Sequence, residues 1–190
     1  LRSLAHYHQQ AYAFHTGLTT AHSYQANAWG WPVMARPTSF FYESEGLNCG
    51  ADTCSQEVIA LGNPVIWWAA VLAVLHQVWR WAAVRDWRAG AVLCGFLAGW
   101  APWLMYQERT VFSFYSIVFL PFMIMALTLS LGTILGTTAD SRDRRGNGAV
   151  AVLAFLIVAV GVSWWFYPVW TADVLTYHEW QMRMWLPTWV

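Results

Sequence analysis

The sequence predicts an all-α integral membrane protein in which four transmembrane helices follow an extracytoplasmic amphipathic helix and loop segment. Apolar residues make up 58% of the 190 residues and charged residues only 11%, well below the charged share of soluble domains. The chain contains 15 tryptophans, and indole rings concentrate where the hydrocarbon of a bilayer meets water. The third observation is a series of four long apolar runs that begins at Pro64.

Charge and motifs exclude several classes of protein. Ten basic and ten acidic residues cancel, so no overall field favours nucleic acid as a partner. All basic residues are arginines, which excludes lysine Schiff-base chemistry within this stretch. No P-loop, nucleotide-binding glycine motif, G-x-S-x-G or H-E-x-x-H occurs, which argues against a nucleotide-driven pump and hydrolases of those classes. The first residues do not resemble a signal peptide, and we expect the chain to begin inside a longer protein.

Residues 1–63 are predicted to form an extracytoplasmic segment. Leu1–Leu18 has apolar residues at helical spacing, but it is too polar to cross a bilayer. This helix is expected to lie on a protein or membrane surface. Thr19–Gly62 contains turn and breaker signals, such as Trp29-Gly30-Trp31-Pro32 and Asn48-Cys49-Gly50, so it is interpreted as a loop-rich stretch.

Residues 64–190 are predicted to form a four-helix transmembrane region with an extracytoplasmic C-terminal tail. Each apolar run approaches or exceeds the roughly 17–25 residues that a helix needs to cross a bilayer. The connections between the runs are too short to supply polar faces that would cover four buried helices of a soluble protein. The four runs are Pro64–Trp81, Ala89–Tyr106, Val111–Leu135 and Ala149–Trp170.

The distribution of arginine predicts the orientation. Three arginines lie at or just after the end of the first run, and three follow the third. Arg109 alone lies between the second and third runs, and Arg183 alone lies in the tail. Since arginine-rich loops stay in the cytoplasm, the N-terminal segment, the turn at Arg109 and the C-terminal tail should face outward. We therefore expect a multi-pass protein of the cell membrane. The six arginines of the two cytoplasmic loops are Arg80, Arg85, Arg88, Arg142, Arg144 and Arg145.

The three cysteines are interpreted by where each is expected relative to the membrane. Cys49 and Cys54 lie in the outer segment, where a disulfide is permitted, although the sequence does not require one. A metal pair is disfavoured, because no further cysteine lies on that side. Cys94 falls inside an apolar run and is interpreted as a small packing residue.

Histidines, acids, arginines and aromatics gather in the segments predicted to face outward. Such a surface suits a polar group carried on a lipid, because arginine binds phosphate in a two-pronged fashion, but an ordinary membrane interface is also aromatic and polar. His8 and His15 are seven residues apart, whereas zinc pairs on helices favour i, i+4. Glu108 and Arg109 could form an exposed ion pair, or Arg109 could meet a lipid phosphate at the membrane edge.

Several motifs together resemble one family. Ala13–Leu18 and His22–Pro32 resemble the pattern F-H-x-x-L followed by H-x-Y-x-S-x-P-W-x-W-P, and Arg36-Pro37 follows at the expected place. Leu61–Trp68 resembles an LGNP-x-x-W-W entry to a spanning helix, and Arg109–Tyr115 resembles an R-x-x-F-x-x-Y opening. The family is the dolichyl- or polyprenyl-phosphate-mannose protein O-mannosyltransferases, and the stretch resembles their C-terminal four-transmembrane region. Ala26 and Ala28 depart mildly from the family pattern, which has Ser and Pro there.

The resemblance implies a glycosyltransferase of the GT-C class that moves mannose from polyprenyl-phosphate-mannose to Ser or Thr hydroxyls of secreted proteins. The family's catalytic acids lie near the N-terminus of the full enzyme and have no counterpart here, so we expect no catalytic residue in this stretch and no activity of the stretch alone. No cofactor is expected and no metal site is predicted in this stretch, while the metal requirement of the enzyme stays open. The partners would be the lipid-linked donor, the acceptor polypeptide and membrane lipid, with no nucleic acid. The candidate substrate-binding residues are Arg109 and Arg36 for the phosphate, and His15, His22, Tyr24 and Asn63 for the sugar and acceptor.

Two other classes of function stay open on the sequence. One is a related lipid-linked sugar transferase that modifies a lipid or a glycan. The other is a non-catalytic membrane or transport module, for which charged or broken helices at the middle of the membrane would be expected. The centres of the predicted spans carry few ionisable residues, which disfavours a transporter.

Overall fold

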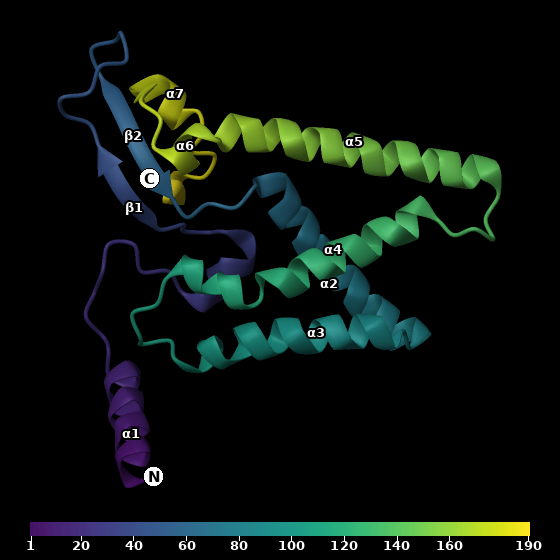
Figure 1. Ribbon diagram of the computed structural model, residues 1–190, viewed down its shortest axis with the longest axis horizontal. Helices are drawn as coiled ribbons and strands as arrows, with labels where there is room; N and C mark the ends of the chain where they lie inside the picture. The colour runs from purple at the N-terminus through teal and green to yellow at the C-terminus, as the bar shows by residue number, and fades with distance from the viewer.

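The computed structural model describes residues 1–190 and is mostly helical (Figure 1). Four long helices run back and forth between two ends of the molecule, and the short elements of the N-terminal third and of the C-terminal tail gather at one of these ends (Figure 1). The long helices are α2 (Pro64–Val84), α3 (Trp87–Trp100), α4 (Leu120–Leu135) and α5 (Arg142–Phe166).

The predicted helix over Leu1–Leu18 is present as α1 (Arg2–Thr16). None of its residues is buried, and it projects away from the four long helices (Figure 1). Its C-terminal end is held by a hydrogen bond from the N–H of Thr110 to the carbonyl of Leu18 (3.0 Å). That the exposed apolar side chains of α1 lie on a lipid or protein surface stays a prediction.

The first predicted span corresponds to α2. The side chain of Asn63 accepts a hydrogen bond from the N–H of Ile66 (3.1 Å), which satisfies one of the free donors at the start of a helix. Pro64 occupies the first helical position, where its missing N–H removes no helical hydrogen bond. The helix ends at Arg85, whose backbone is left-handed (φ 56°).

The second and third predicted spans are each divided into an α-helix and a 3₁₀ segment. α3 is continued by η2 (Ala101–Met105), and α4 is preceded by η3 (Ser113–Val118). Pro102 and Pro121 lie at the starts of the elements they introduce, because proline has no N–H to continue a preceding helix. With the 3₁₀ pieces included, the two spans measure about 31 and 36 Å, enough for the roughly 30 Å of a bilayer.

Length and apolarity together select one helix, α5, as able to cross a membrane, and α4 is a shorter apolar helix. α2 has 21 residues and is about 32 Å long, so its length also suffices. The four predicted runs therefore correspond to four helical segments, but only α5 satisfies both criteria by itself.

The fourth predicted span has different ends from those expected. It begins at Arg142 instead of Ala149 and stops at Phe166 instead of Trp170. Ser141 starts the helix by accepting a hydrogen bond from the N–H of Arg144 (3.2 Å). Arginine is a good helix former, so a charged stretch expected to be a loop forms the first turn of α5. Pro168 begins a separate short helix, α6 (Pro168–Thr171).

The all-α expectation is wrong for the loop-rich stretch and the tail, which form a three-stranded antiparallel sheet. β1 (Ser39–Glu43) pairs with β2 (Cys54–Ile59), and β2 pairs with β3 (Leu175–Thr176). The strands are rich in aromatic and β-branched residues, which favour extended backbone. The tail continues with α7 (Tyr177–Gln181) and η4 (Pro187–Trp189), and the loop before the sheet contains η1 (Ala28–Val33).

Cys49 and Cys54 form a disulfide, with 5.9 Å between their Cα atoms. The bridge links the connection between β1 and β2 to the first residue of β2. The local bridge that the sequence left open is therefore present. Cys94 is a free cysteine exposed on α3, so its interpretation as a packing residue is wrong.

The core lies where α2, α3 and α4 meet, and Ala70, Phe119, Met123 and Ala126 are fully buried there. A Cβ atom at Gly99 would lie 3.2 Å from the backbone nitrogen of Phe119, so glycine permits the close approach of α3 to the start of α4. This packing leaves the end of α3 and the turn that follows it next to α1.

Candidate functional site

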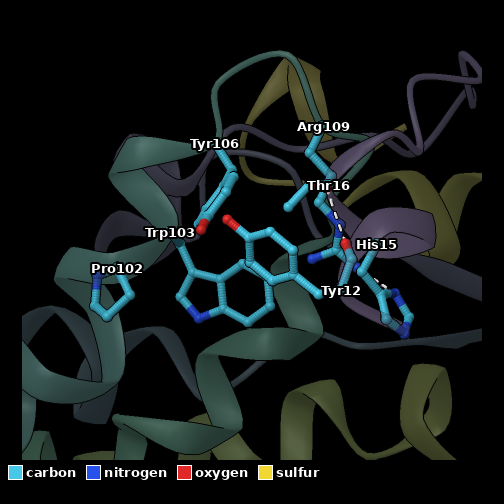
Figure 2. A pocket seen from close by; sticks show the side chains of 7 residues that line it. All are labelled: Tyr12, His15, Thr16, Pro102, Trp103, Tyr106 and Arg109. Atoms are coloured by element: carbon cyan, nitrogen blue, oxygen red, sulfur yellow. Dashed lines mark hydrogen bonds between the residues drawn. The ribbon is translucent and has the colours of Figure 1, made fainter. Parts of the chain in front are cut away.

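A pocket of about 220 Å³ lies between α1 and the turn that joins the second and third spans (Figure 2). α1 contributes three side chains, and the end of the second span and the following turn contribute four. The hydroxyl groups of Tyr12 and Tyr106 face one another across it (Figure 2). Its lining consists of Tyr12, His15, Thr16, Pro102, Trp103, Tyr106 and Arg109.

Arg109 is the charged side chain of this pocket. Its Nη2 atom lies 3.2 Å from Nδ1 of His15, and its Cζ atom lies 5.3 Å from the ring centre of Trp103 and 5.9 Å from that of Tyr115. These distances allow attraction between the cation and both ring faces. The Nε atom of Arg109 is buried and has no hydrogen-bond partner. A buried donor without a partner is unfavourable, so the guanidinium has unused capacity for an acceptor.

The N-terminal loop fixes the turn that carries Arg109. Besides the backbone bond from Thr110 to Leu18, the hydroxyl of Thr110 donates to the carbonyl of Thr20. The N–H of Ala26 donates to the carbonyl of Val111 (2.8 Å). The pocket therefore depends on contacts between segments about ninety residues apart in sequence.

Glu108 does not pair with Arg109. The ion pairs of the structure are those of Asp86 with Arg80 and with Arg88, and Glu108 is exposed. Arg109 is instead directed toward His15 and the aromatic rings. The exposed ion pair that the sequence left open is thus absent from this structure.

The structure brings His15 and Arg109 together, and none of the other four candidates lines their pocket. His22 accepts a hydrogen bond through Nδ1 from the N–H of Tyr24 (3.1 Å). Its ring meets Phe112 edge to face at 5.0 Å, and Phe112 in turn contacts Tyr115 at 6.2 Å. His22 is therefore connected to the pocket through two rings, and neither His22 nor Tyr24 lines it.

Arg36 and Asn63 make other contacts. The guanidinium of Arg36 donates through Nε and Nη2 to the carbonyl of Ser23, at 3.1 and 2.7 Å. The amide of Asn63 donates to the carbonyl of Ala159 (2.7 Å) and to the hydroxyl of Ser163 (2.8 Å). Arg36 thus holds the N-terminal loop, and Asn63 joins the start of α2 to α5.

Sequence reasoning did not assign Tyr12, Trp103 and Tyr106 to the site. Tyr12 and His15 are three residues apart, which places them on one face of a helix. Trp103 and Tyr106 close the second apolar run, where aromatic residues are expected at a membrane interface. These positions were visible in the sequence, but nothing in it indicated that α1 folds back toward the end of the second span.

A second unusual group on this end of the molecule is Glu57 on β2, with 3% of its surface exposed. Its Oε2 atom accepts a hydrogen bond from the indole N–H of Trp180 (2.6 Å). Burial raises the pKa of the Glu57 carboxyl, and hydrogen bonds from Ser39 and Trp180 oppose the rise. Its contacts join the sheet to α7 and do not reach the Arg109 pocket.

The chain matches a family model along almost its whole length. The model describes the C-terminal four TMM region of protein-O-mannosyltransferase and covers residues 1–189. Polyprenol-phosphate-mannose–protein mannosyltransferases from Mycolicibacterium smegmatis and Mycobacterium tuberculosis are 36% and 34% identical to it. The alignments cover all of this chain but 38% and 37% of those relatives.

A solved structure has the same fold. The S. cerevisiae protein O-mannosyltransferase Pmt1-Pmt2 complex bound to the sugar donor matches with a TM-score of 0.76 at 23% identity. The match covers 96% of this chain and 26% of the yeast chain. The match of the family model to residues 1–189, together with the bacterial relatives, establishes that this chain belongs to the protein O-mannosyltransferase family and corresponds to its C-terminal four-transmembrane region.

Proposed function

We propose that this chain is the C-terminal membrane part of an enzyme that transfers mannose from polyprenyl-phosphate-mannose to Ser or Thr hydroxyls of secreted proteins. The names of the bacterial relatives, which specify a polyprenol-phosphate-mannose donor and a protein acceptor, support this function. The chain spans little more than a third of the length of those relatives, 37% and 38%, so the transfer is proposed for the whole enzyme.

The observation that carries the proposal is the Arg109 pocket. A guanidinium forms two-pronged, charge-assisted hydrogen bonds with phosphate, and the buried Nε of Arg109 has no partner within the protein. Aromatic walls at Trp103 and Tyr106 provide flat apolar surfaces for a sugar ring or for the first units of the lipid. We therefore assign Arg109 to the donor phosphate and His15 to its orientation through their 3.2 Å contact.

The proposed orientation places this pocket on the outer side of the cell membrane, with both ends of the chain extracytoplasmic. Six of the ten arginines lie in the connection of residues 85–86 and in the helix ends beside it and beside the connection of residues 136–141. The two connections adjoin one another at the opposite end of the molecule. Arginine-rich connections on one side of a membrane protein favour the cytoplasm. The donor would then meet Arg109 at the outer membrane edge, where secreted acceptors are available.

Substitution of Arg109 in the full-length enzyme tests the assignment. Arg109→Ala is expected to reduce mannose transfer by about 2–4 kcal/mol of transition-state stabilisation, comparable to the loss of one oxyanion donor. Arg109→Lys should recover only part of this, since an ammonium group cannot form the two-pronged bond. The assay is transfer from polyprenyl-phosphate-mannose to an acceptor peptide, at matched expression and with the fold of each variant verified.

Glu108→Ala is the matched control, because Glu108 is the exposed neighbour of Arg109 and makes no ion pair with it. It should leave transfer and donor affinity unchanged. Normal turnover and normal donor affinity in Arg109→Ala would remove Arg109 from the donor site and move the phosphate role to Arg36 or to the part of the enzyme outside this chain.

A further inference from the structure

The end of the bundle opposite the Arg109 pocket carries a polar cleft of about 440 Å³ between α2, α3 and α4. Three arginines line it, one each from α2, α3 and α5, and two aspartates from the connections. The threonines and glycines of the lining lie on the last turns of α4 and in the connection that follows α4. The lining is Arg80, Asp86, Arg88, Thr128, Leu129, Gly132, Thr133, Gly136, Thr137, Asp140 and Arg144.

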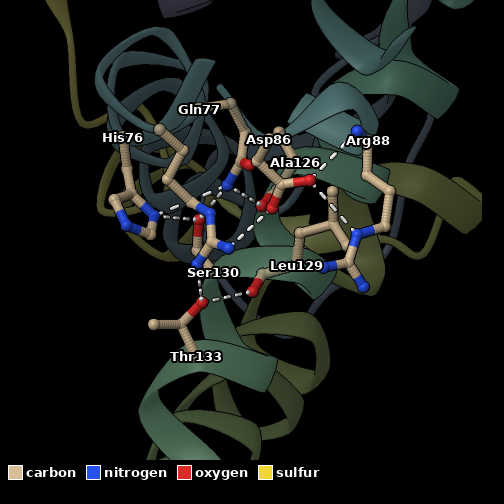
Figure 3. Close-up of polar contacts among 9 residues, drawn as sticks. His76, Gln77, Asp86, Arg88, Ala126, Leu129, Ser130 and Thr133 are labelled. Atoms are coloured by element: carbon tan, nitrogen blue, oxygen red, sulfur yellow. Dashed lines mark hydrogen bonds and ion pairs between the residues drawn. The ribbon is translucent and has the colours of Figure 1, made fainter. Parts of the chain in front are cut away.

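Both aspartates of the cleft accept hydrogen bonds from neighbouring side chains or backbone. Asp86 accepts from Nη2 of Arg80 (2.6 Å) and from Nε of Arg88 (3.2 Å), as Figure 3 shows for Asp86 and Arg88. Asp140 accepts from the N–H and the hydroxyl of Thr137, at 2.6 and 2.9 Å. The Nη atoms of Arg88 have no protein partner, and the side chain of Arg88 is 60% exposed. The cleft thus presents free cationic donors at Arg88, while Asp86 is ion-paired and Asp140 keeps one oxygen, Oδ1, without a partner.

An apolar groove of about 480 Å³ adjoins this cleft. It runs between α2, α4 and α5 from the level of Ala69 to the level of Ile134, and it shares Thr133 and Arg144 with the cleft. Its walls are mostly Ala, Leu, Ile and Phe side chains. The polar groups of this region, His76, Ser130 and Gln77, are bonded to one another (Figure 3).

Arg144 stands at the junction of the two cavities. Its Nη1 donates to the carbonyl of Ile134 (2.7 Å) and its Nη2 to the carbonyl of Thr133 (3.2 Å). These contacts hold the guanidinium at the mouth of the groove, at the end of α4. The cleft carries cationic groups, and the apolar groove leads from it toward the bilayer centre. Together they match an amphiphile, which has a polar headgroup and an apolar chain.

We propose that the cleft and the groove bind one anionic phospholipid of the cytoplasmic leaflet, with its phosphate beside Arg88 and Arg144 and an acyl chain along α4 in the groove. The site is separate from the proposed donor pocket and rests on the proposed orientation. Six arginines against three aspartates lie in the two connections and the adjoining helix ends, which favours an anionic over a neutral headgroup. Basic pockets between helices on the cytoplasmic side recognise such lipids.

Filling the cleft is the sharpest test. A Cβ atom at Gly132 would meet nothing within 4 Å, so Gly132→Leu places a side chain in the cleft without a clash in α4. Gly161→Leu is the matched control, because Gly161 on α5 is equally open and lines neither cavity. The measurement is native mass spectrometry of the purified full-length enzyme titrated with phosphatidylglycerol or with phosphatidylcholine. The wild type and Gly161→Leu should retain phosphatidylglycerol, and Gly132→Leu should lose it.

A pair of arginine variants tests the charge. Arg88→Gln should lower the affinity for phosphatidylglycerol about fivefold, the effect expected of one arginine near an anionic lipid. Arg85→Gln removes the same charge three residues earlier in the chain, but Arg85 does not line the cleft. The affinity of this variant for phosphatidylglycerol should stay at the wild-type value.

Three results would overturn the proposal. Equal retention of phosphatidylglycerol and phosphatidylcholine would remove the selectivity for an anionic headgroup. Equal losses in Arg85→Gln and Arg88→Gln would indicate general charge attraction without a site. Displacement of phosphatidylglycerol by polyprenyl phosphate, blocked by Gly132→Leu, would assign the cavities to the carrier lipid. Lipid retention is measured without turnover, so failure here is distinguishable from failure of the proposed transferase activity.

Discussion

Glu57 is an acid that the fold encloses between the sheet and α7, and its environment has a measurable consequence. Its carboxyl accepts hydrogen bonds from the indole of Trp180 and from the side chain of Ser39. Burial raises the pKa of Glu57 above the ordinary value of 4.5, so the folded protein holds this proton more tightly than the unfolded chain. Its contribution to stability is therefore fully present below the ordinary pKa and is lost as pH rises through the raised value.

Glu57→Gln should remove this pH dependence. The amide oxygen of glutamine can still accept from Trp180, but the side chain carries no charge at any pH. We expect the melting temperature of the wild type to fall relative to the variant as pH rises from about 4 to 8. Thermal unfolding in detergent, followed by tryptophan fluorescence across that range, measures the difference. Parallel curves for the two proteins would mean that Glu57 titrates alike in the folded and unfolded states.

At the scale of elements, Asn63 connects two helices with one side chain. Its oxygen caps α2 at Ile66, while its nitrogen donates to Ala159 and Ser163 on α5. A helix cap is worth about 1 kcal/mol, and each neutral hydrogen bond contributes about 1 kcal/mol. The start of α2 is therefore stabilised both by the cap within the helix and by the hydrogen bonds to α5.

Two substitutions separate these contributions. Asn63→Ala is expected to lower the free energy of unfolding by about 2–3 kcal/mol, because the cap and the contacts to α5 are both lost. Asn63→Ser keeps a good cap but is too short to reach α5, and it should cost about 1–2 kcal/mol. Denaturant titration of the full-length enzyme in detergent gives both values. Unchanged stability with weakened donor binding would instead support the substrate-binding role expected from the sequence.

The helices were predictable from sequence because each carries its own signal, whereas the sheet was not. Apolar length marked α2 and α5, and Asn63-Pro64 marked where α2 begins. The strands are short, and β3 pairs with a segment about 120 residues away, so no local pattern reveals it. The Arg109 pocket was missed in part for the same reason, since His15 and Arg109 meet only through contacts 94 residues apart.

At the scale of the whole molecule, the polar groups are concentrated at two opposite ends. One end carries the sheet, the disulfide and the Arg109 pocket, and the other carries the connections with Arg85, Asp86 and Asp140 (Figure 1). Between them, the outer faces of the long helices expose large apolar side chains, as expected where lipid replaces water. A disulfide at the first end fits an oxidising compartment, which independently favours the outward orientation of that end.

Single cysteine reporters test this orientation. Asp173 in the tail and Ala139 in the connection before α5 are exposed, and Ala139 is preferable to Asp140, whose carboxyl is bonded to Thr137. The background should keep the Cys49–Cys54 disulfide, which does not react with maleimides, and carry Cys94→Ser. In intact cells expressing the full-length enzyme, an impermeant maleimide should label Asp173→Cys and not Ala139→Cys. After permeabilisation both should react, which shows that each thiol is accessible. If both positions are labelled in intact cells, they lie on the same side of the membrane. A single crossing by α5 between them would then be excluded, and the four-span topology with it.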